Sequence, residues 1–502
     1  MLKLWNTATR SLQEFHPLNE KLVGLYTCGP TVYWTAHIGN LRTYVFEDVL
    51  LRTLEMEGYA VKRVMNITDV GHLTSDEDEG DDKMEVAAKR EGKSATDIAE
   101  YYTQRFVEDT ATLNIRLPEA PLFCKATEHI PEQLELIQEL EKKGFTYQTS
   151  DGIYFDTAKF PNYGALSGQK LEEKEAGARV AVNDEKRNAS DFALWKFSYP
   201  SVIPAKAGIQ DEKDSETMDS RLRGNDNKKR QQEWPSPWGI GFPGWHIECS
   251  AMAKKYLGQP FDIHCGGVDH IPVHHENEIA QSEAAYGVKL ANYWMHGEFL
   301  LVDGGKMSKS LGNVYSIADL KAKGFDPLAL RLLFLGSHYR QKQNFTFEAL
   351  QGAQNSLNKL RHHVRSLVVP PMAIGGTQDA EKGLDSRLRG NDNVTDFKTA
   401  LEDDLNTPVA LACLWKILDD ASISDDQRVV AIVSMDRVLG LNLTQEIGRV
   451  IAIPEDILAL AKQREDVRAA RDWAESDRLR DELLRLGWIV KDTKLGSELE
   501  QK

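Results

Sequence analysis

The sequence predicts a doubly wound α/β fold with a parallel sheet, interrupted by an inserted connective domain and followed by all-α C-terminal domains. Residues 22–27 and 60–67 are short apolar runs typical of buried strands, and the amphipathic segment 40–58 between them is typical of a helix. Two further strand candidates, 261–265 and 298–302, follow only after a long gap. Strands separated by helices form parallel sheets, and the gap indicates an insertion between two halves of one fold.

The length of 502 residues exceeds that of one ordinary domain, and the pattern of elements divides the chain into four parts. The expected parts are an α/β domain of residues 1–115 and 232–303, a connective insertion of residues 116–231, a loop with following helices over residues 304–396, and a helical domain of residues 397–502. Within the insertion, Pro131 and Gly144 delimit a helix over 131–143, and Ser150-Asp151-Gly152 predicts the turn of a β-hairpin.

The turn between the first strand and the first helix contains His37-Ile38-Gly39-Asn40. Backbone N–H groups and the helix dipole point out of such a turn, so it is suited to a polyphosphate. Gly39 lets the backbone approach a ligand, and His37 and Asn40 can donate hydrogen bonds to oxygens on which negative charge develops. A histidine that merely satisfies the start of a helix is an equally good interpretation of this motif on its own.

A second motif, Lys306-Met307-Ser308-Lys309-Ser310, lies on a loop flanked by Gly304, Gly305 and Gly312. Its lysines are mobile cations suited to the same phosphates. Taken alone, it is equally well explained as a solvated charge cluster. The two motifs together, in this order, predict a site at which the α-phosphate of ATP is attacked.

The two motifs resemble the HIGH and KMSKS signatures of class I aminoacyl-tRNA synthetases. Three further segments, 26–33, 243–252 and 274–280, resemble the cysteinyl-tRNA synthetase family in particular. Asn40 departs from this family, which has a second histidine there; an amide still donates a hydrogen bond but carries no proton or charge. The resemblance implies a Rossmann-like catalytic domain with these site residues: catalytic His37, Asn40, Lys306 and Lys309; ATP-binding Gly39, Gly267, Asp269 and Lys309; and substrate-binding Thr68 and Trp245.

Four scattered residues form a candidate metal site. His274 and Glu278 are spaced i, i+4 at the start of a helix expected to run to Tyr286, so they share one face. From the residues alone, buried cysteines and a helix-capping histidine explain the pattern better than a metal does. The resemblance reverses this preference, because Cys28, Cys249, His274 and Glu278 match the family's Zn²⁺ ligands one by one. Cys265, where the family more often has glycine, is expected to be a small buried residue.

The resemblance also implies an activity. The chain is expected to use ATP with Mg²⁺ to convert L-cysteine to cysteinyl-adenylate and to transfer cysteine to the 3′-terminal adenosine of tRNA(Cys), with one Zn²⁺ recognising the thiol. Size alone separates cysteine from serine poorly, which gives the ion a purpose. Three alternatives stay open: a ligase that joins cysteine to a small amine, a zinc hydrolase, and an RNA-binding protein with an inactive nucleotide fold. The hydrolase is disfavoured because the segment at 275–279 lacks the second histidine of HExxH.

Bulk composition fits a globular protein of the reducing cytoplasm. The chain has 41% hydrophobic and 27% charged residues, five cysteines and no apolar run that could span a bilayer or serve as a signal peptide. A monomer is expected. The formal charge of −16 leaves room for a local basic surface, for which the arginines of a helix expected over 459–486 are candidates. Interleaved acidic residues favour salt bridges on a solvated helix equally well, and Trp473 and Trp488 are suited either to base stacking or to packing.

The sequence Asp-Ser-Arg-Leu-Arg-Gly-Asn-Asp-Asn occurs twice, at 219–227 and 385–393. Two copies at this separation do not make a solenoid. They resemble translated bacterial repeat elements, and the inserts that contain them, about 201–231 and 372–395, are expected in surface loops, where added length costs little. A basic RNA-binding arm at 228–230 is the alternative for the first insert.

Overall fold

The computed structural model describes residues 1–71, 82–168, 185–198, 230–308, 311–367, 392–450, 452–493 and 496–501. Lys309 lies outside the described residues, as do the two inserts apart from their ends at 230–231 and 392–395. Among the helices that are described, none combines the length and apolar character needed to cross a bilayer.

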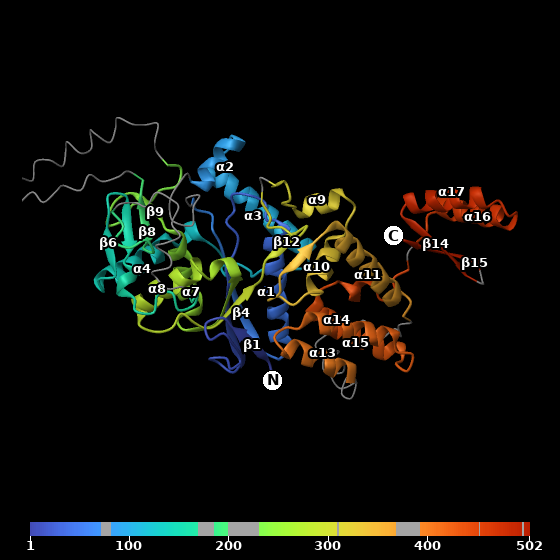
Figure 1. The fold of residues 1–502 in the computed structure, drawn as a ribbon, viewed down its shortest axis with the longest axis horizontal. Coiled ribbons are helices and arrows are strands. Elements are labelled where there is room, and N and C mark those ends of the chain that lie inside the picture. Colours follow the sequence, from blue (N-terminus) through green and yellow to red (C-terminus); the bar gives the residue numbers. More distant parts are fainter. Residues whose placement is uncertain are drawn as a thin grey trace, which may run out of the picture.

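A five-stranded parallel sheet lies at the centre of the molecule, in the order β11-β10-β3-β4-β5 (Figure 1). Its strands are β3 (Leu22–Thr27), β4 (Ala60–Ile67), β5 (Phe123–Lys125), β10 (Phe261–Gly267) and β11 (Ala291–Gly297). The predicted strands 22–27, 60–67 and 261–265 are therefore confirmed. β10, which follows the insertion, pairs directly with β3, so the two halves of the sequence share one sheet.

The prediction that 298–302 is a strand of this sheet is wrong. Those residues contain β12 (Leu300–Val302), which pairs in parallel with β13 (Gln343–Phe345) in a separate two-stranded sheet. The sheet position belongs to β11, in which six of the seven residues are buried. A strand of a parallel sheet covered by helices is buried on both faces even at the edge of the sheet, where β11 lies, whereas β12 has three residues and a half-buried middle one.

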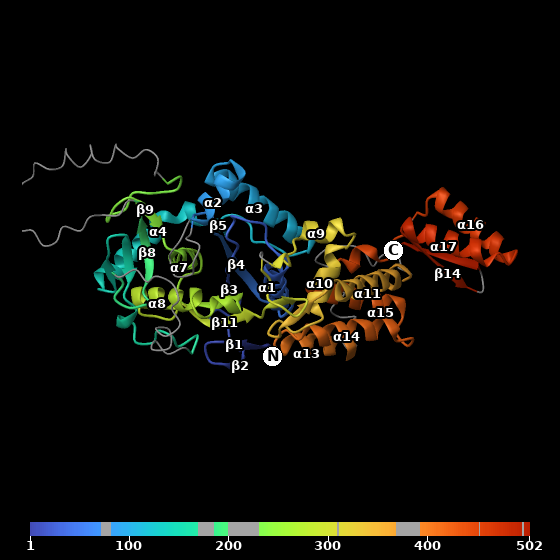
Figure 2. The ribbon, with the colours of Figure 1, turned by 45° about the horizontal axis from the view of Figure 1, so that its top comes forward.

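Helices cover both faces of the central sheet (Figure 2). The helices of the α/β domain are α1 (Ile38–Met56), α2 (Lys83–Glu91), α3 (Ala95–Thr112), α7 (Trp245–Leu257) and α8 (His274–Tyr286). Figures 1 and 2 show α1 on one side of the sheet and α7 with α8 on the other. This is the doubly wound arrangement that the alternation of strands and helices predicts.

The connective insertion contains the predicted helix and hairpin, here α4 (Ile130–Lys142) and the strands β6 (Thr146–Gln148) and β7 (Gly152–Phe155). β8 (Phe192–Phe197) and β9 (Gly241–Pro243) complete an antiparallel sheet in the order β6-β7-β8-β9. One hydrophobic cluster joins this sheet to α4, α7 and α8. Because β9 leads directly into α7, the inserted sheet sets the position of Trp245 at the start of that helix.

The region after the sheet is helical. Its helices are α9 (Ile317–Ala322), α10 (Pro327–Leu335), α11 (Phe347–Arg365), α13 (Asp392–Glu402), α14 (Thr407–Asp419) and α15 (Asp425–Leu439). Their buried residues form one hydrophobic cluster with residues of α1 and α3. A hairpin of β1 (Lys3–Asn6) and β2 (Ser11–Glu14) at the N-terminus lies close to α13 in Figure 1. These helices therefore share a core with the α/β domain.

The C-terminal end forms a small module with its own core, at the red end of the chain in Figure 1. It consists of α16 (Glu455–Ala469), α17 (Trp473–Arg485) and the antiparallel strands β14 (Trp488–Thr493) and β15 (Gly496–Gln501). The single helix predicted over 459–486 is wrong, because Arg471 has a φ of 65° and the chain reverses there before Asp472 caps α17. The hairpin is a feature that the sequence analysis did not anticipate.

Candidate functional site

A cavity of about 360 Å³ opens at the carboxyl ends of β3, β4 and β10. Cys28, Thr68 and Gly267 lie at or directly after the ends of these three strands, and all three residues line the cavity. Ligands bind at this edge of doubly wound sheets because the loops of successive units converge there. The cavity is therefore where the fold favours a nucleotide.

The turn at His37 lines one wall of this cavity and caps α1. The His37 Nδ1 accepts a hydrogen bond from the backbone N–H of Asn40 at 3.2 Å, and the Asn40 Oδ1 accepts one from the backbone N–H of His37 at 3.1 Å. An accepting Nδ1 requires the proton of a neutral ring to sit on Nε2. The helix-capping interpretation of this motif is therefore confirmed. The cap uses neither His37 Nε2–H nor the Asn40 side-chain amide, and phosphate binding by these two groups stays a prediction.

The two signature motifs meet at the cavity. A Cβ added to Gly39 would collide with the terminal methyl group of Met307, so the glycine permits the contact. The backbone N–H of Ile38 donates to the carbonyl of Tyr315 at 2.9 Å, which joins the start of α1 to the chain beyond the lysine loop. Met307 and Ser308 line the cavity, whereas Lys306 is exposed and does not line it.

The expected nucleotide and amino-acid residues are also brought together. Gly267, Asp269, Thr68 and Trp245 all line the cavity. The Thr68 hydroxyl is buried and donates to the Glu248 carboxylate at 2.8 Å. The Trp245 ring lies 4.5 Å from the His274 ring, centre to centre, which places it beside the predicted metal ligands.

Cys28, Cys249, His274 and Glu278 form a buried cluster whose ligand atoms all lie within 4.8 Å of one another. The His274 Nε2 lies 2.9 Å from the Glu278 Oε1, and the Cys28 Sγ lies 3.9 Å from the same oxygen. Two thiols, an imidazole and a carboxylate are donors that suit Zn²⁺. The donor set and its compactness therefore fit the predicted ion.

The charges of the cluster also favour a cation. Burial alone would lower the pKa of His274, but Glu278 and Cys249 raise it to about 10. Burial would raise the pKa of Cys249, but hydrogen bonding with Cys28 and the charge of His274 lower it to about 7. Burial opposes ionisation of Glu278 as well, yet His264 and His274 hold its pKa well below the ordinary value. The cluster thus holds a proton between anions, in a place that a metal ion would take.

Cys28 and Glu278 also belong to a second group of possible ligands, completed by His264 and His275. Cys249 and His274 line the cavity, whereas His264 and His275 do not. The first group is therefore the one that a substrate can reach. In the second, the His264 Nε2 lies 2.9 Å from the Glu278 Oε2, an arrangement that orients a ligand carboxylate.

These supporting histidines were not predicted. The His275 Nδ1 lies 2.8 Å from the His296 Nε2, and His270 lines the cavity. Burial lowers the pKa of His270 to about 4. One signal was present in the sequence, since six of the 13 histidines lie between residues 246 and 296, but density alone does not show which of them meet.

Other predictions concern residues away from the cavity. Cys265 is fully buried in β10, as expected. Of the C-terminal aromatic residues, Trp488 is buried in the core of the module, whereas Trp473 is exposed. Most of the candidate basic residues form salt bridges, namely Arg464 and Arg468 with Asp492, Arg478 with Glu475 and Glu482, Arg480 with Asp477, and Arg485 with Glu482. The salt-bridged interpretation thus holds for these arginines, but Arg464 is buried rather than solvated.

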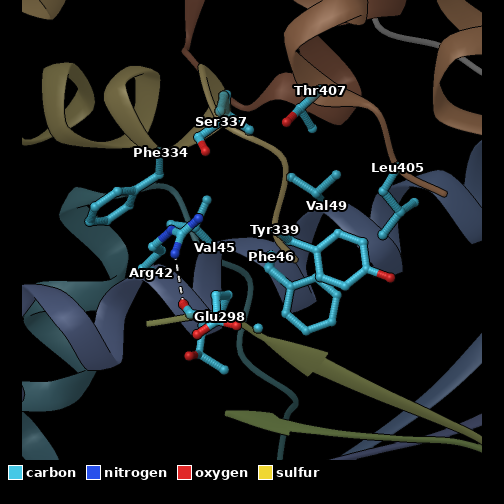
Figure 3. Close-up of a pocket in the computed structure, with 13 residues that line it drawn as sticks. Arg42, Val45, Phe46, Val49, Glu298, Phe334, Ser337, Tyr339, Leu405 and Thr407 are labelled. Carbon is cyan, nitrogen blue, oxygen red and sulfur yellow. Dashed lines mark hydrogen bonds between the residues drawn. The ribbon is translucent and has the colours of Figure 1, made fainter. Parts of the chain in front are cut away.

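A second, smaller hollow lies along α1 and is not suited to this chemistry. Figure 3 shows the Phe46 and Tyr339 rings stacked in its wall, 4.4 Å apart, near Leu405. Its volume of about 30 Å³ is close to that of one water molecule. Arg42 lies at one end and donates to the carbonyl of Glu298. This hollow lies at the interface between the α/β domain and the helices that follow.

Comparison with known proteins agrees with the geometry. A family model described as tRNA synthetases class I (C) catalytic domain matches residues 14–207 and 201–355, and a model of the cysteinyl-tRNA ligase anticodon binding domain matches residues 452–498. A cysteine–tRNA ligase of Burkholderia lata is 47% identical over 99% of this chain and 96% of its own length, and one of Treponema denticola is 42% identical over 98% of each.

A solved structure of Mycobacterium tuberculosis methionyl-tRNA synthetase with methionyl-adenylate covers 85% of this chain and 93% of its own, with a TM-score of 0.54 and 16% identity. At this identity the likeness supports the class I fold alone. Full-length identity to the curated relatives, the matched catalytic model and the meeting of both signature motifs at one cavity lead to one conclusion. The chain belongs to the cysteinyl-tRNA synthetase family.

Proposed function

We propose that this chain, a cysteine–tRNA ligase, selects its amino acid through a thiol-binding zinc site that opens into its nucleotide cavity. The observation that carries the proposal is the buried cluster of Cys28, Cys249, His274 and Glu278, because it shares the cavity with the His37 turn. An amino acid held there by its side chain has its carboxylate directed toward the α-phosphate of ATP.

The reaction has two steps. The cysteine carboxylate attacks the α-phosphate, which gives cysteinyl-adenylate and pyrophosphate, with Mg²⁺ accompanying the nucleotide. The 3′-terminal adenosine of tRNA(Cys) then attacks the adenylate and releases AMP. No protein nucleophile is needed, so the protein accelerates both steps by positioning and by stabilising charge.

The residues at the His37 turn act on the phosphates. His37 donates from Nε2 and Asn40 from its amide to oxygens whose charge grows in the transition state. Gly39 keeps the turn close to Met307 and thereby brings the lysine loop to the same phosphates. Lys306 and Lys309 supply the cations of that loop; closure of the loop over ATP is what brings the exposed Lys306 to its ligand.

Gly267 and Asp269 hold the adenosine. A Cβ at Gly267 would collide with the Asp269 carboxylate, so the glycine allows that side chain its position in the cavity wall. A carboxylate at this edge of the sheet is suited to ribose hydroxyls. Thr68 and Trp245 form the wall of the amino-acid pocket beside His274.

When bound by the cluster, Zn²⁺ supplies a soft Lewis acid that favours a thiolate over the hydroxyl of serine. Cys28, Cys249, His274 and Glu278 would be its ligands, and His264 orients the Glu278 carboxylate. A zinc hydrolase is disfavoured, because hydrolysis would leave the lysine loop without a role. The C-terminal module matches an anticodon-binding model, which supports tRNA(Cys) rather than a small amine as the acceptor. We also propose that a single chain suffices for this reaction.

Replacing Cys249 with serine tests the proposal. We expect Cys249→Ser to lower zinc content and to reduce the preference for cysteine over serine in ATP–pyrophosphate exchange by at least tenfold. Cys265→Ala, which changes a buried cysteine of β10 outside the cluster, is the matched control and should leave both unchanged. Unaltered discrimination in Cys249→Ser would contradict the proposed role of the cluster.

Lys309→Ala separates the phosphate chemistry from the metal. It should suppress adenylate formation by about 10²-fold, as loss of one transition-state contact typically does, while zinc content stays at the wild-type level. Parallel loss of zinc and exchange activity would show that the loop and the cluster do not have these separate roles.

A further inference from the structure

Lys83, at the start of α2, lies in the cavity wall at a place that the reaction described above leaves without a role. Its Nζ lies 5.9 Å from the centre of the Tyr33 ring and 6.0 Å from the centre of the Trp245 ring. Among the described residues that line the cavity, Lys83 is the only lysine or arginine. The cation thus lies between two aromatic walls of the substrate site.

These two walls belong to opposite ends of the site. Tyr33 precedes the His37 turn, where the phosphates bind, and Trp245 packs on His274, where the thiol binds. The amino-acid carboxylate is the group that joins these ends, because it is linked to the thiol through two carbon atoms and becomes bonded to the α-phosphate. A cation that approaches both walls is therefore placed toward the carboxylate.

The start of α2, which carries Lys83, is held in place by its neighbours. Asp82 caps α2 by accepting from the backbone N–H groups of Met84 and Glu85, and it forms an ion pair with Arg230. The Arg230 guanidinium lies 3.7 Å from the centre of the Phe242 ring in β9, the strand that leads to Trp245. The start of α2 and the Trp245 wall are thus tied to each other through buried and half-buried groups.

We infer that Lys83 is a specificity-determining residue that pairs with the carboxylate of the amino-acid substrate. This inference rests on the proposed function, since the thiol end of the substrate must bind at the metal cluster. A charge-assisted pair in a partly enclosed cavity discriminates strongly against a ligand that lacks the carboxylate. Lys83 would therefore select free amino acids over thiol-containing amino alcohols and amines that lack the carboxylate.

The test compares L-cysteine with L-cysteinol, which keeps the thiol and the amine but has a hydroxymethyl group in place of the carboxylate. Dissociation constants are measured by titration calorimetry on zinc-containing wild-type protein, Lys83→Met, Lys83→Arg and Lys89→Met. Lys89 is an exposed lysine of the same helix and provides the matched control.

We expect Lys83→Met to weaken cysteine binding by about tenfold or more and to change cysteinol binding by less than twofold. Lys83→Arg should keep most of the preference for cysteine, and Lys89→Met should bind both ligands as the wild type does. Equal weakening for both ligands, or no weakening for cysteine, would overturn the inference. A wild-type protein that binds cysteinol no better than serinol would instead overturn the proposed thiol site, and the placement of the carboxylate with it.

Discussion

The Asn40 side chain caps α1 and lies at the wall of the cavity. Its Oδ1 closes the capping box with the backbone of His37, and we propose that its amide group donates to the phosphates in the cavity that the residue lines. A histidine at this position would add a group able to carry charge, and asparagine offers a neutral donor in its place. The departure from the family motif is therefore accommodated by the helix cap.

Asn40→Ala should lower kcat for ATP–pyrophosphate exchange by about 10- to 100-fold, because a transition-state donor is lost, and should leave the KM for cysteine within about twofold. Asp97→Ala is the matched control, since Asp97 occupies the same position in the Ser94 capping box of α3. That variant should lose stability by about 1 kcal/mol through the cap alone, without a change in kcat. Equal kcat values for Asn40→Ala and wild type would contradict a role for the amide in catalysis.

At the scale of the element, α1 connects the turn at His37 to the helical region that follows the sheet. It begins at the His37 cap, and near its middle the buried Asp48 Oδ2 accepts from Arg52 at 2.8 Å and from Arg331 of α10 at 2.7 Å. Arg331 also donates to the carbonyl of Leu439 at the end of α15. The helix that begins at the His37 turn is therefore tied near its middle to the helical region.

Arg331→Met should lower the free energy of unfolding by about 3–5 kcal/mol, because it leaves buried acceptors without their partner. Chemical denaturation followed by circular dichroism measures this change. Arg478→Met, which removes an exposed guanidinium from salt bridges on α17, is the control and should leave the transition near its wild-type position. If both variants unfold like the wild type, the buried ion pair does not stabilise α1.

The same ion pair predicts a pH dependence. Burial would raise the pKa of Asp48, but Arg331, Arg52 and the backbone N–H of Arg116 hold it below its ordinary value. Because the unfolded state takes up protons first, stability from this group is complete above an unfolded pKa near 3.9 and falls as the pH drops below it. Melting temperatures measured between pH 6 and pH 3 should therefore fall less steeply for Asp48→Asn than for wild type. Parallel profiles would contradict this assignment.

At the scale of the whole molecule, the cavity and the C-terminal module belong to different parts of the chain. The cavity lies in the α/β domain, and the module from Glu455 onward has its own hydrophobic core. Removing residues 452–502 should leave cysteine-dependent ATP–pyrophosphate exchange within about threefold of wild type. Charging of tRNA(Cys), measured as kcat/KM, should fall by at least 10²-fold. Charging that persists in the shortened chain would show that the module does not recognise the tRNA.

The fold and the site were predictable from the sequence to different extents. β3, β4, α4 and α8 follow local rules of apolar periodicity and helix termination, and they were predicted nearly to the residue. The strand β11 was missed because its buried run contains polar residues such as His296, whose burial depends on partners distant in the sequence. The break between α16 and α17 was missed because a left-handed Arg471 has no local signal.

The metal ligands show the same limit. Cys28, Cys249 and His274 come from three separate segments, so spacing alone favoured ordinary buried residues, and only the family resemblance pointed to them. The group that surrounds them, including His264, emerged from the three-dimensional arrangement. Local chemistry thus pointed to the turn at His37, whereas the cluster depends on the topology that brings the end of β3 beside α7 and α8.

The central claim is that a zinc ion held by Cys28, Cys249, His274 and Glu278 binds the thiol of the substrate. Zinc K-edge X-ray absorption of the purified protein tests this claim most directly. We expect one zinc per chain with two sulfur ligands, rising to three when L-cysteine is added and unchanged when serine is added. A protein without bound zinc, or a sulfur count that stays at two in the presence of cysteine, would contradict it.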